Sequence, residues 1–193
     1  MASAKTVQRN RVFMLVMTAL TAAIFCVVGP VSLPIGPVPI SLMTLVLYIS
    51  IYAIGYKYAV VACVLYLLLG LAGLPVFSGF AGGFGKLVGP TGGYLIGYVP
   101  MMLIGGLFIS AMAEKKTSTK RIIVSRFIEA LGLILATAVL YTLGTIWFVI
   151  STGTPVGAAL MLCVVPFLPG DLVKIAISVI VGPGLRSLTN HFQ

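Results

Sequence analysis

The chain has 193 residues, of which 60% are hydrophobic and 8% are charged. A soluble domain carries about 25% charged residues, so this composition cannot cover a water-exposed surface. It excludes a soluble protein and predicts an integral membrane protein. The long apolar runs lack strict alternation, which favours helices over a transmembrane barrel.

The net charge of +9 has two interpretations. A strongly basic chain is typical of nucleic-acid-binding proteins. Membrane proteins also gather positive charge, in their short cytoplasmic loops, and this second interpretation fits the apolar composition. We therefore expect no nucleic acid partner. The three cysteines, Cys26, Cys63 and Cys163, lie within apolar runs without a CxxC pair and are interpreted as packing residues.

The apolar runs predict an all-α integral membrane protein, a single transmembrane domain over residues 1–193. The six predicted spans are residues 12–28, 42–54, 58–71, 94–113, 122–150 and 156–185. The last span is broken at residues 166–170, and the run before Pro166 is either a separate short helix or part of a kinked span. No polar cleavage region follows the first span, so we expect it to stay in the protein.

The first and third connections are long, apolar and rich in glycine and proline. GPVSLPIGPVPIS, residues 29–41, cannot form a helix, and residues 73–93 are dominated by glycine. Irregular backbone near a membrane is tolerated where it is buried or lines a cavity. We therefore expect a binding site near the outer face, roofed by these two connections.

The positions of Lys and Arg test the count of six spans. Six spans put ten of the twelve on one side: Lys5, Arg9, Arg11, Lys57, Lys115, Lys116, Lys120, Arg121, Arg126 and Arg186. Lys86 falls on the other side, and Lys174 lies within a span. Because Lys and Arg are enriched in the cytoplasmic loops of membrane proteins, this distribution predicts that both termini are cytoplasmic and that the first, third and fifth connections face outward.

The stretch PFLPGDLVK, residues 166–174, holds the only Asp of the chain, Asp171, three residues before Lys174. Charges inside a span are costly and by default mark function, and this spacing puts both on one helix face. We expect Pro169 and Gly170 to end the preceding segment, with Asp171 in the first helical turn that follows. The pair is either a helix cap with a neutralising ion pair, or a site where Asp171 accepts ligand N–H groups and Lys174 meets a ligand oxygen. Both roles are compatible.

A second candidate is GKLVGPTGGYLIGY, residues 85–98, which lacks the order of a phosphate-binding loop. Its glycines allow close backbone approach, and Thr91 or Gly92 is expected to begin the fourth span. Free amides at that helix start suit an anion such as a carboxylate. The alternative is an ordinary loop and helix cap.

Four aromatic residues surround this segment: Phe77, Phe80, Phe84 and Tyr94. They either wall an apolar pocket or form an interfacial aromatic belt. Elsewhere, Arg126 and Glu129 are expected to form a local salt bridge.

No enzyme constellation is found in the sequence. HExxH, GxSxG, a metal-ligand cluster and a nucleotide-binding motif are all absent, and the one histidine, His191, is in the tail. We expect neither a catalytic residue nor a metal site, and the chain cannot itself hydrolyse ATP.

The segments GLPVFSGFAGGFGKLVGPTGGYLIGY and PFLPGDLVK, with PVPIS after the first span, resemble the BioY family. These are the biotin-binding membrane subunits, or S components, of energy-coupling factor (ECF) transporters. The resemblance covers nearly the whole chain and implies a high-affinity biotin receptor in a bacterial cell membrane, without a cofactor. One departure is Met43, where the family often has Gln, so no polar ligand contact is assigned there.

The resemblance also implies roles for individual residues. Asp171 would accept the ureido N–H groups of biotin, and Lys174 would donate to the ureido carbonyl or the carboxylate. Tyr94 and Phe77 would pack on the bicycle and tail, while Thr91 and the Gly92 amide would meet remaining polar groups. The full expected set of ligand-binding residues is Asp171, Lys174, Thr91, Gly92, Tyr94, Phe77 and Ser78.

The family further implies partners: a transmembrane coupling subunit and two cytoplasmic ATPases. Ala19 and Ala23 match the small-residue motif that docks the coupling subunit, and such spacing lets helices approach closely. Residues 29–41 would be the lid, and the subunit is thought to topple in the membrane to deliver its vitamin. The alternatives are a solitary facilitator, a receptor for another vitamin, or an intramembrane enzyme that uses Asp171 and Lys174 as acid and base.

Overall fold

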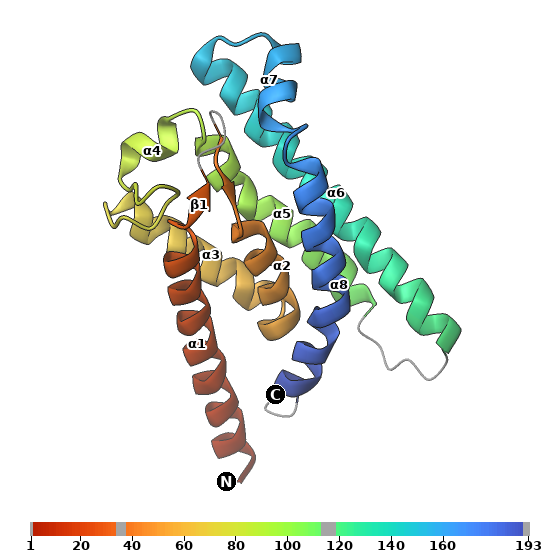
Figure 1. The fold of residues 1–193 in the computed structure, drawn as a ribbon. Coiled ribbons are helices and arrows are strands. Elements are labelled where there is room, and N and C mark those ends of the chain that lie inside the picture. The colour runs from red at the N-terminus through yellow and green to blue at the C-terminus, as the bar shows by residue number, and fades with distance from the viewer. Residues whose placement is uncertain (1, 34–37, 113–118, 191–193) are drawn as a thin grey trace.

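The computed structural model describes the backbone of residues 2–33, 38–112 and 119–190. Figure 1 shows a bundle of helices with a short hairpin near one end. The elements, in chain order, are α1 (Ala2–Val28), β1 (Ser32–Leu33), β2 (Ile40–Ser41), α2 (Met43–Ile54), α3 (Tyr56–Leu71), α4 (Phe84–Val88), α5 (Gly92–Ala111), α6 (Thr119–Thr152), α7 (Val156–Cys163) and α8 (Leu168–Asn190).

Four helical segments are long and apolar enough to cross a membrane. They are Asn10–Val28, Gly92–Ala111, Arg121–Thr152 and Leu168–Arg186. Two shorter apolar helices, α2 and α3, accompany them. The chain is therefore a helical, multi-pass membrane protein, as the composition predicted.

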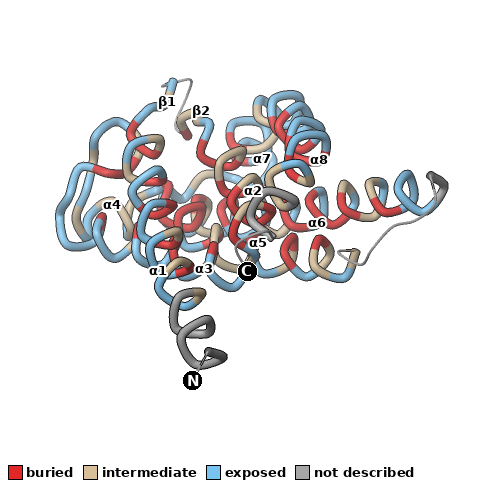
Figure 2. Tube along the Cα trace, turned by 90° about the horizontal axis from the view of Figure 1, so that it is seen from below, coloured by how far each residue is buried: buried red, intermediate tan, exposed pale blue. Residues whose placement is uncertain are grey.

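The helices bury one face and leave apolar side chains on the other. On α1, Met14 and Phe25 are buried, while Leu15, Val16 and Val27 are exposed. Figure 2 shows the same division, with buried segments between the helices and exposed segments around the periphery. An apolar outer face is expected of a helix surrounded by lipid, so the fold does not need a polar exterior.

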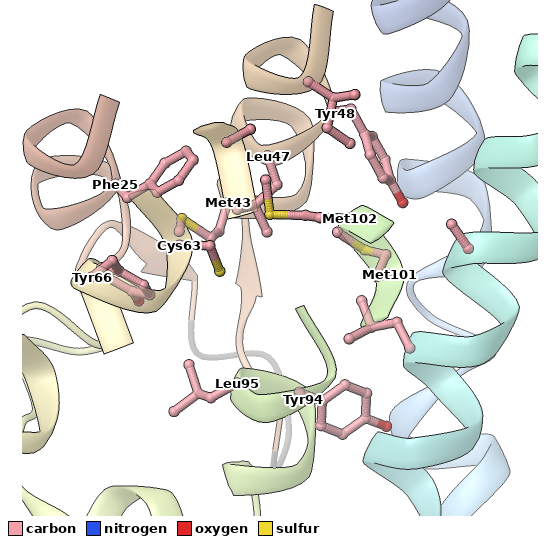
Figure 3. Packing of buried hydrophobic residues seen from close by; sticks show 14 of the residues in the cluster. Phe25, Met43, Leu47, Tyr48, Cys63, Tyr66, Tyr94, Leu95, Met101 and Met102 are labelled. Carbon is pink, nitrogen blue, oxygen red and sulfur yellow. The ribbon is translucent and has the colours of Figure 1, made fainter. Parts of the chain in front are cut away.

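Aromatic and sulfur-containing side chains pack the interior of the bundle. Figure 3 shows Met43, Met101 and Met102 between α2 and α5, with Tyr66 and Phe25 on the side of α3 and α1. The Phe25 and Tyr66 rings meet edge to face, with centroids 6.3 Å apart. Cys63 and Cys163 are buried and Cys26 is half-buried, and all three are free thiols. The interpretation of the cysteines as packing residues is confirmed.

The first connection, between α1 and α2, contains a small antiparallel sheet that was not predicted. Ser32 pairs with Ser41, and Leu33 pairs with Ile40. The described part of this connection has no helix, as its prolines require. Residues 34–37, the middle of the expected lid, lie outside the described residues.

The third connection also carries an unpredicted element, the short helix α4. Three residues, from Gly89 to Thr91, separate α4 from α5. Gly92 makes this tight join possible, because a Cβ atom there would lie 1.6 Å from the Leu87 carbonyl oxygen. The turn GPTGG, residues 89–93, therefore begins α5 directly after α4.

The break in the last apolar region lies earlier than predicted. The run before Pro166 is a separate short helix, α7, and the turn occupies residues 164–167 rather than 166–170. Pro169 and Gly170 belong to the first turn of α8 and do not end the preceding segment. A proline is tolerated there because the first N–H groups of a helix have no intrahelical partner. Asp171 lies in that first turn, as expected.

Candidate functional site

Asp171 and Lys174 form a buried ion pair in the first turns of α8. Lys174 Nζ lies 2.7 Å from Asp171 Oδ1, and the two side chains are 10% and 6% exposed. The spacing of three residues puts them on one face of the helix, as the sequence predicted. We call them the pocket pair, because both line a pocket described below.

The Lys174 ammonium group donates all of its hydrogen bonds to protein acceptors. Nζ donates to the Ser41 carbonyl oxygen at 2.7 Å, to Thr44 Oγ1 at 3.1 Å and to Asp171 Oδ1 at 2.7 Å. An ammonium has three donors, so each one has a protein acceptor. Lys174 thereby joins α8 to β2 and α2, and a ligand oxygen would have to replace one of these acceptors.

Asp171 has acceptor capacity to spare. Thr44 Oγ1 donates to its Oδ1 at 3.2 Å, and the Tyr141 hydroxyl of α6 donates to its Oδ2 at 2.5 Å. With Lys174, three donors reach a carboxylate that offers about four lone-pair positions. The carboxylate is therefore neutralised and oriented, and it still has a position for a ligand N–H group.

The pocket pair lines a pocket with an empty volume of about 410 Å³, which we call the charged lobe. Its other lining residues are Val38, Pro39, Ser41, Thr44, Tyr94, Tyr98, Leu140, Tyr141, Cys163 and Phe167. Most of this wall is apolar or aromatic, with few polar groups. Such a lining, mostly apolar with a few polar groups that converge, is typical of small-molecule sites.

An adjoining pocket of about 390 Å³, the neutral lobe, contains no charged residue in its lining. It shares five lining residues with the charged lobe: Val38, Pro39, Ser41, Tyr94 and Tyr98. Thr91, Ser78 and Met43 also line it. Five of the seven expected ligand-binding residues thus line one lobe or both: Asp171, Lys174, Tyr94, Thr91 and Ser78.

Two of the expected residues lie outside both lobes. Phe77 is fully buried, with its ring centroid 5.5 Å from that of Tyr66, and it fills the space above Gly70. The Gly92 amide donates to the Gly89 carbonyl oxygen at 3.0 Å. Phe77 is therefore packed in the core and the Gly92 amide closes a turn. Their expected contacts with a ligand stay predictions.

Phe80 and Phe84 are largely exposed and line neither lobe. This favours the interfacial belt over the pocket wall for these two residues. Tyr94 is the one member of the aromatic group that reaches the pocket.

Tyr94 is held in place by α6 and α7. Its ring packs where Gly144 has no side chain, since a Cβ atom there would lie 2.3 Å from the ring. Its hydroxyl donates to the Cys163 carbonyl oxygen at 3.3 Å and shares a hydrogen bond with Thr145 Oγ1 at 3.3 Å. Figure 3 shows this hydroxyl directed toward α6. The ring is therefore a fixed wall between the two lobes.

Three further residues line the charged lobe without having been predicted: Thr44, Tyr98 and Tyr141. Thr44 lies 127 residues from Asp171, and Tyr141 lies 30 residues away. In the sequence, each of these residues is visible only as a polar side chain within an otherwise apolar span. Such a side chain does not indicate which distant residue it will contact.

A second ion pair, Arg126 with Glu129 on α6, confirms the predicted local salt bridge at 2.9 Å. Glu129 is buried and accepts hydrogen bonds from Ser125 Oγ at 3.0 Å and from the Tyr52 hydroxyl at 3.3 Å. Twelve residues of α6 separate Glu129 from Tyr141, about 18 Å along a helix. We call this the distal pair, and it lines neither lobe.

The remaining predicted surface is on α1. Ala19 and Ala23 are both exposed, on the side opposite the buried Met14 and Phe25. Within the described residues, no group of three or more His, Cys, Asp or Glu side chains could hold a metal ion.

An apolar helical bundle with a buried ion pair on the wall of a mostly apolar pocket is typical of a membrane receptor or carrier for a small molecule. The BioY family model matches residues 2–191. The chain belongs to the BioY family, and the relatives it matches are transporters rather than enzymes.

Individual relatives agree with this assignment. The chain is 36% identical over 175 residues to the biotin transporter BioY of Thermotoga maritima, covering 90% of this chain and 96% of that protein. It is 33% identical over 184 residues to biotin transporter BioY2 of Lactococcus lactis subsp. cremoris, covering 95% and 96%. Its fold matches the crystal structure of the S-component for biotin from an ECF-type ABC transporter, with a TM-score of 0.79, 28% identity and 92% of each chain covered.

Proposed function

We propose that this protein is the high-affinity biotin-binding subunit of an ATP-driven ECF-type importer. The observation that carries the proposal is the Asp171 carboxylate, buried on the wall of the charged lobe with an unused acceptor position. Membership of the BioY family then selects biotin among the ligands that this wall suits.

Biotin fits the two lobes by its chemistry. Its ureido ring offers two N–H donors and one carbonyl, its thioether ring is apolar, and its tail ends in a carboxylate. Asp171 accepts a ureido N–H group, and Lys174 pairs with the Asp171 carboxylate and orients it. Tyr94 and Phe167 supply apolar surface for the rings, while Thr91 and Ser78 serve the remaining polar groups of the ligand in the neutral lobe.

Transport requires partners in this proposal. No nucleotide-binding motif is present in the sequence, so the energy must come from other chains. We propose a transmembrane coupling subunit and two cytoplasmic ATPases, with Ala19 and Ala23 as the docking surface on α1. The exposure of both alanines on the outward face of α1 supports this assignment.

We further propose six membrane passages with both termini on the cytoplasmic side. The start of α1 and the end of α8 lie at the same end of the bundle in Figure 1. Arg11, Arg121 and Arg186 lie at or next to the ends of the candidate spans Asn10–Val28, Arg121–Thr152 and Leu168–Arg186, where the positive-inside distribution expects basic residues.

Calorimetric titration of the purified protein with biotin tests the ligand. We expect one-to-one binding of biotin and no heat from thiamine or riboflavin. If biotin gives no heat, the ligand assignment is wrong and the pocket pair must serve another molecule.

Reconstitution tests the transport mechanism. We expect liposomes holding this chain alone to take up no biotin, and uptake to need the coupling subunit, the two ATPases and ATP. Changing Ala19 and Ala23 to Leu should abolish uptake without weakening biotin binding, because bulk on α1 blocks close helix approach. ATP-independent uptake by the chain alone would favour a solitary facilitator instead.

A further inference from the structure

Trp147 is the only tryptophan of the chain, and it lies on α6 outside the lining of both lobes. Its indole Nε1 donates a hydrogen bond of 2.9 Å to the Gly89 carbonyl oxygen. This bond joins α6 to the turn between α4 and α5, 58 residues away in sequence. We propose that Trp147 is a positioning residue that holds this turn, and with it the Thr91 and Tyr94 wall of the pocket, against α6.

The turn is shaped to receive the indole. A Cβ atom at Gly93 would lie 2.2 Å from Trp147 Cβ, and one at Gly92 would lie 3.2 Å from Nε1. Side chains at these positions would push the turn away from α6. The glycine pair of GPTGG therefore permits the indole to lie directly against the backbone that begins α5.

The hydrogen bond fixes a carbonyl that the turn itself depends on. The Gly89 oxygen also accepts a hydrogen bond of 3.0 Å from the Gly92 amide, and this bond closes the turn. The indole therefore holds the acceptor of that bond in place. Thr91 lies between these two glycines, and Tyr94 follows two residues after Gly92. A shift of the turn would consequently move both pocket-lining side chains.

The same stretch of α6 holds both sides of the pocket. Gly144 and Thr145 hold the ring and hydroxyl of Tyr94, and Tyr141 donates to Asp171. Tyr141 and Trp147 are six residues apart, about 9 Å along a helix. Trp147 thereby keeps the α5 wall at a set distance from the Asp171 carboxylate, and both are needed to enclose one ligand.

This inference rests on the proposed biotin site, and the Trp147→Phe variant tests it. Phenylalanine keeps an aromatic ring and removes the N–H donor. We expect biotin to bind about 3- to 10-fold more weakly, the effect of one lost hydrogen bond transmitted to the pocket wall. The matched control is Phe127→Leu, an aromatic substitution at a strongly exposed position of the same helix, which should leave the biotin Kd unchanged.

Hydrogen exchange provides a readout that needs no ligand. In Trp147→Phe, we expect faster amide exchange in residues 89–95 and unchanged exchange in residues 172–180 of α8. Replacing Trp147 with 3-benzothienylalanine, which keeps the ring shape and lacks the N–H group, should reproduce both effects. This second variant keeps the test decisive if Trp147→Phe folds poorly.

Three outcomes would overturn the proposal: an unchanged biotin Kd in both variants, unchanged exchange at residues 89–95, or equally faster exchange in both segments. Absence of biotin binding by the unaltered protein is a different failure. It would remove the ligand assignment, while exchange at residues 89–95 would still decide whether Trp147 holds the turn.

Discussion

The pocket pair and the distal pair are built alike. Each joins a carboxylate and a cation three residues apart on one helix, at 2.7 Å in the pocket pair and 2.9 Å in the distal pair. In each, the carboxylate is buried and a tyrosine from another helix donates to it, Tyr141 to Asp171 and Tyr52 to Glu129.

Their surroundings differ. Lys174 is enclosed by three protein acceptors and lines the charged lobe, whereas the side chain of Arg126 is 33% exposed and neither member of the distal pair lines a lobe. A buried ion pair by itself is weak evidence of stability or of function, because desolvation offsets much of its attraction. The cavity beside the pair, rather than the ion pair itself, therefore distinguishes the candidate ligand site from a structural contact.

The largest effect is expected from Asp171→Asn. A hydrogen bond to a charged group contributes about 1.5 to 3 kcal/mol, so losing the one from biotin to the carboxylate should raise the Kd about 10- to 100-fold. Calorimetry with biotin measures this change. The matched variant at the distal pair is Glu129→Gln, for which we expect the wild-type Kd. Equal affinity in Asp171→Asn and wild type would remove Asp171 from the site.

The next effect should appear in stability rather than in binding. Glu129→Ala deletes a buried acceptor shared by Ser125, Arg126 and Tyr52. We expect the free energy of unfolding to fall by about 1 to 3 kcal/mol, since Arg126 can still reach water. Thermal unfolding in detergent, compared with the biotin Kd of the same variant, checks this. A higher biotin Kd without a lower melting temperature would contradict the assignment of the distal pair to a structural role.

Tyr141→Phe removes one hydrogen bond from the Asp171 carboxylate and keeps the ring. We expect about 1 kcal/mol of lost binding, or about a 5-fold higher Kd for biotin. The carboxylate keeps Lys174 and Thr44 as donors, so the loss should be smaller than that of Asp171→Asn. A loss as large as that of Asp171→Asn would mean that Tyr141 contacts the ligand itself.

The smallest effect is expected from Tyr52→Phe. The bond from its hydroxyl to Glu129 is 3.3 Å long, and Glu129 retains Ser125 and Arg126. We expect a decrease of about 0.5 to 1 kcal/mol in unfolding free energy, measured by thermal unfolding, and no change in biotin affinity. A change of Kd here would link the distal pair to the pocket.

Local patterns account for what was predicted correctly. Apolar runs, prolines and the single Gly55 between α2 and α3 mark most helix boundaries, because chain stiffness and burial in lipid act on neighbouring residues. The spacing of Asp171 and Lys174 places them on one face of any helix. The strands β1 and β2 and the helix α4 were not predicted. Such short elements show no clear hydrophobic periodicity, and they form because of tertiary contacts.

Composition and local spacing were enough to predict the class of protein, most of the helices and the two ion pairs, since each depends on composition or on contacts within one helical turn. Which pair lines a pocket depends instead on how the helices pack. The same packing brings Thr44 and Tyr141 to Asp171, sets the Phe77 ring against Tyr66, and leaves the Gly92 amide bonded within a turn. The contacts of Asp171 and Phe77 join separate helices or connections. Which side chains meet across a bundle depends on how whole helix faces pack together, and no local spacing encodes that.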